Sequence, residues 1–315
     1  MSDKENNERK KKLFALRRGY YCPSFFKLGV ETVYNLGDLN TLQTEPEPFS
    51  TFFHEYIHFL QDVTTSFGLA NGCIIVDRMK YANHEVFRQG VSFQVPLSLK
   101  EDATTEINKE IHKVYLGDGY GSAPSAITVT KVKEVDSAVM LPAPYSKYVP
   151  RVKVTFKKDD TTGTFDFGAF CIMETMTHIA QNRYHTVAHD AVPYRAGQLI
   201  AQSEYDVIGK NDLFVFALCD ACLMTFQPGL TFYRALCHMK NDGFYPSNER
   251  EVYDFVIRNF KAENTPLMSH FSWMSGYATV QYIGYLTTRT FDNERHWIHH
   301  VLIKAHELRI NNPYF

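Results

Sequence analysis

Apolar side chains recur with two different periods along the chain. In residues 52–89 and 168–315 they are mostly three or four positions apart, which is typical of helices, whereas in residues 90–167 they alternate with polar ones, which is typical of strands. The pattern therefore predicts an α+β fold dominated by helices, with a strand-rich insertion in the middle of the chain. Residues 1–12 are a run of charged side chains, and we expect them to form a disordered, solvated tail.

The strand-rich insertion contains short alternating segments separated by Pro, Gly and Asp turn residues. Within it, residues 101–115 are compatible with a helix, and Asp159–Gly163 predicts a hairpin turn. A further half-buried strand is expected at Val30–Tyr34, so that a small antiparallel sheet would lie beside the next helix. The predicted strands of the insertion are residues 91–95, 126–130, 152–156 and 164–167.

The first predicted helix covers residues 52–65. Pro46 and Pro48 are expected to stop regular structure before it, because proline lacks the amide hydrogen that a helix interior uses. Ser50 or Thr51 can then accept a hydrogen bond from the first turn as an N-cap. The expected helix therefore begins only a few residues before its most chemically distinctive segment.

Glycines are expected to separate this helix from the next one. Gly68 and Asn71–Gly72 predict the end of the first helix, and a second helix is expected at residues 74–89. In the C-terminal part, Ser247 is the expected cap of one helix. The helices predicted there cover residues 168–184, 193–206, 211–226, 230–240, 248–262, 275–287 and 291–309. We expect the whole chain to form one compact unit.

The distinctive segment is His54-Glu55-Tyr56-Ile57-His58. On an α-helix, residues four apart lie on one face, so the imidazoles of His54 and His58 can bind the same Zn²⁺. Glu55, next to the first histidine, then projects toward the coordination position that is left for water. There it can act as a general base, which is the chemistry of a metallopeptidase.

Apolar neighbours indicate that this helix is buried. Two histidines and a glutamate are costly in such surroundings unless a metal or hydrogen bonds satisfy them. The alternative is a core helix whose histidines bond to backbone carbonyls. The apolar neighbours are Phe52, Phe53, Tyr56, Ile57, Phe59 and Leu60.

A catalytic zinc site needs a third protein ligand, and Glu174 is the best candidate. It is the one acidic residue in a strongly apolar helical segment, and a lone carboxylate there is expensive to bury without a cation. His178 lies one turn later on the same face, where it can hydrogen-bond to a ligand or coordinate the metal directly.

A helical H-E-x-x-H followed by a glutamate from a separate downstream helix resembles the gluzincin group of zinc metallopeptidases. The resemblance covers residues 54–58 and 174–178. It implies a zincin-like fold with His54, His58 and Glu174 as ligands and Glu55 as general base. In that group, a polar residue four positions after the third ligand often orients a ligand histidine. The departure is the long segment between the two motifs, which the strand-rich insertion fills.

The segment after this helix offers rival ligands and possible oxyanion stabilisers. His185 and His189 are again four apart and Asp190 follows, so either a third histidine ligand or a partly exposed loop is compatible with the pattern. Tyr184 and His185 are our candidates for polarising the scissile carbonyl. The other tyrosines that could do this are Tyr194 and Tyr205.

Asp62 lies one turn beyond His58 on the first helix. Its carboxylate could accept a hydrogen bond from a ligand histidine and so orient the ring. A carboxylate that faces solvent is equally compatible with the sequence.

The composition of the chain indicates which partners and which cellular location to expect. The chain has 315 residues, 44% of them hydrophobic, and a formal net charge of −2, which suits a globular protein and not one that binds nucleic acid. Six cysteines are scattered, and the charged N-terminus lacks the apolar core of a signal peptide. The longest apolar run, Leu213–Phe226, is too short to span a bilayer. We therefore expect no membrane association and a reducing, cytoplasmic location.

These observations predict an intracellular zinc endopeptidase that cleaves a protein or peptide substrate with narrow specificity. Two alternatives stay open. One is a non-catalytic, zinc-stabilised scaffold or interaction protein, and the other is a hydrolase of small amides or an aminopeptidase-type enzyme. The sequence leaves the oligomeric state open.

Overall fold

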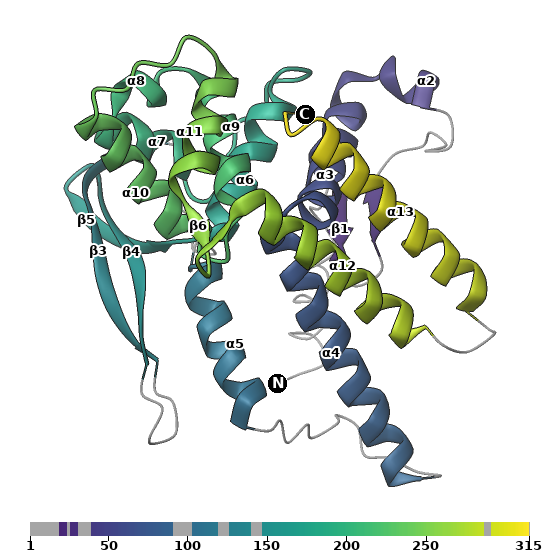
Figure 1. Cartoon of the computed structure of the whole chain (residues 1–315). Helices are drawn as coiled ribbons and strands as arrows, with labels where there is room; N and C mark the ends of the chain where they lie inside the picture. The colour runs from purple at the N-terminus through teal and green to yellow at the C-terminus, as the bar shows by residue number, and fades with distance from the viewer. Residues whose placement is uncertain are drawn as a thin grey trace, which may run out of the picture. The chain divides into compact units, whose positions relative to one another are not determined.

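The structure is a computed structural model, in which helices dominate and small antiparallel sheets accompany them (Figure 1). This confirms the predicted α+β class. The tail at residues 1–12, the strand at 91–95 and most of the strand at 30–34 fall outside the residues that the structure describes. The described residues are 19–23, 26–30, 39–90, 103–118, 126–139, 147–286 and 291–314.

Backbone contacts divide the chain into two compact units. The first comprises residues 1–59 and 177–187, and the second comprises residues 60–176 and 188–315. The boundaries predicted from composition, after residues 89 and 167, both fall inside the second unit. None of the described helices combines the length and the hydropathy that a membrane span requires.

The first unit contains a two-stranded antiparallel sheet, β1 (Gly19–Cys22) and β2 (Lys27–Val30), in which Gly19 pairs with Val30. A short helix, α2 (Leu39–Gln43), precedes α3 (Pro46–Thr64), the helix with the histidine pair. The sheet lies beside this helix, because Gly19 packs against the side chains of Thr51 and Glu55.

Helix α3 begins earlier than predicted. Pro46 and Pro48 start the helix instead of stopping structure before it, because amide groups of the first turn have no partner within a helix and their loss costs nothing. Ser50 and Thr51 consequently lie inside the helix and cap nothing. Their hydroxyls donate to the carbonyl of Glu47, at 2.9 and 3.1 Å.

The predicted gap after this helix is wrong as well, because α4 (Ser66–Gln89) follows α3 almost directly. Thr65 is its N-cap, and the threonine hydroxyl accepts a hydrogen bond from the amide of Gly68 at 3.0 Å. Gly68 and Gly72 lie inside α4 because of close packing. A Cβ atom at Gly68 would overlap the α3 backbone, and one at Gly72 would overlap the Tyr282 hydroxyl.

This packing predicts opposite effects for two glycine-to-alanine changes. Gly68→Ala should lower the free energy of unfolding by about 1–3 kcal/mol, because the added methyl overlaps backbone atoms that cannot easily move. Gly276→Ala, at an open and exposed position within α12 (Leu267–Tyr285), should raise it by about 0.5–1 kcal/mol. Urea unfolding followed by circular dichroism would measure both. Equal effects of the same sign would contradict the assigned role of Gly68.

The insertion belongs to the second unit and forms a helix followed by a three-stranded antiparallel meander. Lys158 pairs with Thr161, which places the predicted hairpin turn at Asp159–Asp160. Val132, Val154 and Phe165 are aligned on one face of the sheet and are buried. The elements are α5 (Ala103–Leu116), β3 (Thr128–Val139), β4 (Lys147–Lys158) and β5 (Thr161–Phe167), in the sheet order β3-β4-β5.

The C-terminal part is helical, as predicted. The predicted cap Ser247 is wrong by one residue. Asn248 caps the helix that follows, because its side chain accepts a hydrogen bond from the amide of Glu251 at 3.1 Å. Ser247 donates its backbone amide to the Glu251 carboxylate. The strands β6 (Lys261–Ala262) and β7 (Thr265–Pro266) were not predicted. The helices are α6 (Ala169–Gln181), α7 (Ala196–Glu204), α8 (Asp206–Gly209), α9 (Asp212–Cys222), α10 (Pro228–Asn241), α11 (Glu249–Asn259), α12 and α13 (Asp292–Asn311).

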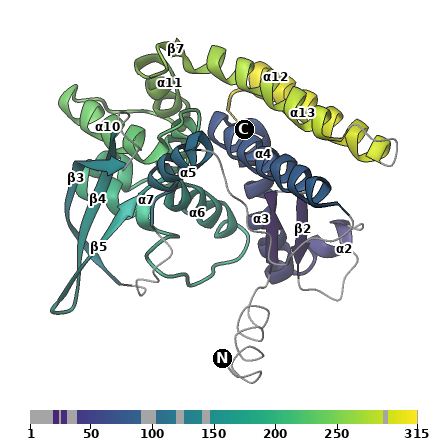
Figure 2. The same ribbon diagram turned by 90° about the horizontal axis from the view of Figure 1, so that it is seen from below.

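A buried ion pair fixes the end of the last helix within the second unit. Helices α12 and α13 contact each other and run side by side in both views (Figures 1 and 2). Arg309 of α13 is fully buried, and its two terminal nitrogens donate to both carboxylate oxygens of Asp220 on α9, each at 2.8 Å. The Tyr253 ring lies 5.3 Å from the guanidinium carbon. This arrangement joins α9, α11 and α13.

Candidate metal centre

Helix α3 places His54 and His58 on one face, as the four-residue spacing predicts. Their ring centroids are 5.0 Å apart, and the planes meet at 79°. His54 is buried and His58 is half-buried. The rings therefore neither diverge around the helix nor extend into bulk solvent, which are the two arrangements that would exclude a shared metal ion.

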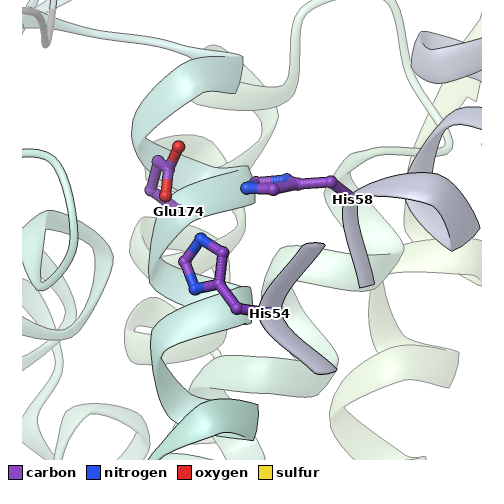
Figure 3. A group of neighbouring side chains, drawn as sticks. All are labelled: His54, His58 and Glu174. Atoms are coloured by element: carbon purple, nitrogen blue, oxygen red, sulfur yellow. The ribbon is translucent and has the colours of Figure 1, made fainter. Parts of the chain in front are cut away.

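Glu174 of α6 completes a group of three possible ligands. One nitrogen of each imidazole and one oxygen of the carboxylate all lie within 4.8 Å of one another. Figure 3 shows that the three side chains point toward a common space. In the part of the chain that the structure describes, no other group of three His, Cys, Asp or Glu side chains is close enough to share a metal. The rival set that includes His185 and His189 is not assembled.

Two hydrogen bonds pair α3 with α6. In the middle of α3, His54 Nδ1 lies 3.2 Å from Gln181 Oε1, and near the end of α3 the side-chain amide of Gln61 donates to the carbonyl of Met173 at 3.2 Å. Residue numbers rise along one helix as they fall along the other, so the two helices are antiparallel. This pairing brings Glu174 level with the histidines.

Gln181 orients one of the possible ligands. An amide oxygen only accepts hydrogen bonds, so the contact places the proton of His54 on Nδ1 and leaves Nε2 with a lone pair for a metal. Gln181 is not among the site residues predicted from the sequence. A signal was present, since Gln181 follows Glu174 by seven residues, two helical turns, and therefore shares its face.

Gln181→Met tests this orienting role. The side chain keeps its approximate volume but loses the acceptor, so the affinity for zinc should fall about 10- to 100-fold. Competition with a chromophoric zinc chelator would measure the change. Gln181→Glu, which retains an acceptor for Nδ1–H, should bind zinc at least as tightly as the unaltered chain. Equal losses in both variants would show that packing at this position matters and the acceptor does not.

Glu55 lies on the side of α3 that faces the first strand. Its side chain is half-buried, and a Cβ atom built on Gly19 would be 3.1 Å from the carboxylate oxygen Oε1. The same atom would be 2.7 Å from Thr51 Cγ2. The backbone of β1 therefore lies so close to Glu55, the predicted general base, that a side chain at position 19 would collide with it.

The predicted supporting residues His178 and Asp62 are both buried. His178 contacts the amide of Asn182, at 3.0 Å from its Nε2, and is not one of the three grouped side chains. Asp62 does not face solvent, so that alternative is wrong. The burial of Tyr282 on α12 raises the pKa of that tyrosine, and the charge of Asp62 raises it further. Whether either residue orients a ligand histidine stays a prediction.

The candidate oxyanion stabilisers Tyr184 and His185 lie in the turn after α6. Their amides donate to the carbonyl of Gln181, the residue whose side chain contacts His54. The Tyr184 ring is half exposed and packs edge-on against Phe49 and Phe53 of α3, with centroids 5.1 and 4.7 Å away. The two residues therefore stand near one end of α3, and their predicted role stays a prediction.

The donor set fits a catalytic zinc ion. Two imidazoles and one carboxylate are the protein ligands that several zinc hydrolases use, with one position left for water or substrate. The same set also suits non-haem iron, so the donors define a divalent transition-metal site without selecting its metal. Comparison of the chain with protein-family models, with curated proteins and with solved structures gave no match.

Proposed function

We propose that this protein is a zinc-dependent peptidase that hydrolyses a peptide bond of a specific protein target. The observation that carries the proposal is the group of His54, His58 and Glu174, whose ligand atoms lie within 4.8 Å of one another. A carboxylate and two imidazoles assembled from helices far apart in sequence are difficult to explain by packing alone, because each is costly to desolvate without a cation.

His54, His58 and Glu174 would hold the metal. Zn²⁺ at such a site lowers the pKa of a coordinated water to about 7 and polarises carbonyl groups. Glu55 supplies a carboxylate on the next position of the helix, where it accepts a proton and returns it to the leaving amine. Gln181 keeps the His54 ring in the tautomer that can bind metal.

We further propose that the enzyme acts in the reducing cytoplasm. All six cysteines are free thiols, and four of them are buried, which suits a compartment where disulfides do not form. Burial raises the pKa of the buried Cys171 and Cys219 thiols, so these side chains are inert core residues.

Metal analysis and a peptide library test the proposal together. Elemental analysis of the purified chain should find about one zinc per chain, and incubation with a peptide library, read by mass spectrometry, should give new termini at a restricted set of sequences. A chelator should abolish cleavage, and added zinc should restore it. Metal without cleavage of peptides or whole-cell proteins would favour the scaffold alternative, and release of N-terminal residues alone would favour an aminopeptidase.

A further inference from the structure

One face of the sheet of the insertion is covered at the end where Val149 is buried and carries exposed lysines farther along its strands. Helices α5, α7 and α10 all contact the sheet, and Val132, Val154 and Phe165 are buried on one of its faces. On the opposite side, Lys131 and Lys133 of β3 are exposed. This second face is built entirely from residues of one compact unit.

Strand register gathers cations on this face. Lys133 of β3 pairs directly with Lys153 of β4, which in turn pairs with Asp166 of β5. Asp166 forms an ion pair with Arg151. Among the described residues, Lys131, Lys133 and Lys157 form no ion pair, and Lys153 interacts with the Asp166 carboxylate through its charge without forming one. We call these residues the lysine face: Lys131, Lys133, Lys153 and Lys157.

The lysine face works against the stability of the sheet. Like charges directly opposite each other on neighbouring strands repel, and Lys133 and Lys153 occupy such a pair of positions. The chain as a whole carries a formal net charge of −2, so an excess of cations here is a local feature. A local concentration of charge that destabilises the fold is better explained by a partner than by packing.

The spacing of the lysines matches an extended acidic peptide. Side chains on one face of a strand recur about every 6.8 Å, and neighbouring strands lie about 4.8 Å apart. Alternate residues of an extended peptide have the same repeat. The exposed Thr162 and Thr164 of β5 add hydroxyl groups to this face.

We propose that the lysine face binds an extended acidic segment of a partner protein, with carboxylates at alternate positions. A single-stranded nucleic acid is disfavoured, because the outward positions of the described strands carry no aromatic side chain on which bases could stack. The proposal rests on the sheet alone and would stand even if the metal centre did not hydrolyse peptides.

The test is direct binding of a fluorescein-labelled peptide of five Glu-Thr repeats to the full chain, measured by fluorescence anisotropy. Binding should weaken as salt increases, and the matching Gln-Thr peptide should not bind. The double variant Lys131→Glu/Lys133→Glu should bind at least about tenfold more weakly, because it reverses two charges on the face. Lys240→Glu/Lys261→Glu makes the same net change at exposed lysines elsewhere and should bind like the unaltered chain.

The melting temperature of the Lys131→Glu/Lys133→Glu variant shows whether any loss of binding comes from unfolding. Lys133→Glu turns a repulsive cross-strand pair with Lys153 into an attractive one, so the melting temperature should not fall. Absence of binding to the acidic peptide, or equal losses in the two double variants, would overturn the proposal. Tighter binding of a thymidine oligonucleotide or of phosphatidylserine vesicles through the same lysines would overturn the assignment of a protein partner.

Discussion

Replacement of Glu55 by glutamine should slow peptide hydrolysis about 10²- to 10⁴-fold, the range expected when a general base is removed. Glutamine has nearly the same shape but cannot accept a proton at neutral pH. The metal should be retained, because His54, His58 and Glu174 form the group of possible ligands without Glu55. The measurement is the cleavage rate of a substrate from the peptide library, with zinc content determined on the same preparation.

Glu174→Gln provides the matched comparison. It is the same chemical change on a side chain that belongs to the three-residue group, so we expect loss of zinc and of activity together. Glu55→Gln should separate the two properties. Unchanged hydrolysis by the Glu55→Gln variant would exclude Glu55 as the base, whereas loss of zinc from it would show that Glu55 supports the metal instead.

Asp220→Asn should lower the free energy of unfolding by about 3–5 kcal/mol, the cost expected when one partner of a buried ion pair is removed. Arg309 is fully buried and donates two hydrogen bonds to Asp220. An asparagine has only one oxygen and presents its amide hydrogens to a guanidinium that also donates. The arginine charge would then stay in the interior without a counter-charge from α9. Urea unfolding of the metal-free chain would measure the loss without a contribution from zinc binding.

Two further variants separate burial from charge. Asp206→Asn removes one partner of the exposed pair with Lys210 and should leave the urea midpoint of unfolding almost unchanged. The double variant Asp220→Leu/Arg309→Met, which removes both buried charges, should recover most of the loss caused by Asp220→Asn. A loss below about 1 kcal/mol for Asp220→Asn would show that water reaches Arg309 in solution.

Periodicity predicted most of the elements because each has one buried face. The strand signal in the insertion came from Val152–Phe156, where inward Val154 alternates with polar neighbours. Strand β3 continues to Val139, beyond the predicted residue 130, because exposed charges at Lys133 and Asp136 hide the alternation. Helix α12 begins eight residues before the predicted start, since its first turns are apolar on several sides and show no period.

Glycine and proline were misread where tertiary contacts decide their role. Gly68 resembles a helix end in the sequence, yet it marks the place where α4 passes close to α3. Pro46 resembles a barrier, yet it occupies the first helical position. Short-range rules treat these residues as local breaks, and no local pattern reveals which atoms will lie beside them.

Within the site, helical spacing and the cost of burying a charge were sufficient to predict the three possible metal ligands from the sequence. The histidine pair follows from helical geometry, and Glu174 follows from the expense of an isolated carboxylate among apolar side chains. Gln181 shares the helix face of Glu174, but this spacing alone does not single it out, because glutamine is common on helices and its hydrogen bond to His54 depends on the antiparallel pairing of α3 with α6. Long-range pairing of this kind leaves no short sequence signature.

The contact between Gly19 and Glu55 has an evolutionary consequence. Any larger residue at position 19 would press on Thr51 and on the carboxylate that we assign to proton transfer. Natural selection should therefore remove most substitutions of Gly19, even though this residue takes no part in the chemistry. In homologous chains that keep the histidine pair, we expect glycine at this position, or a smaller residue in place of threonine to compensate.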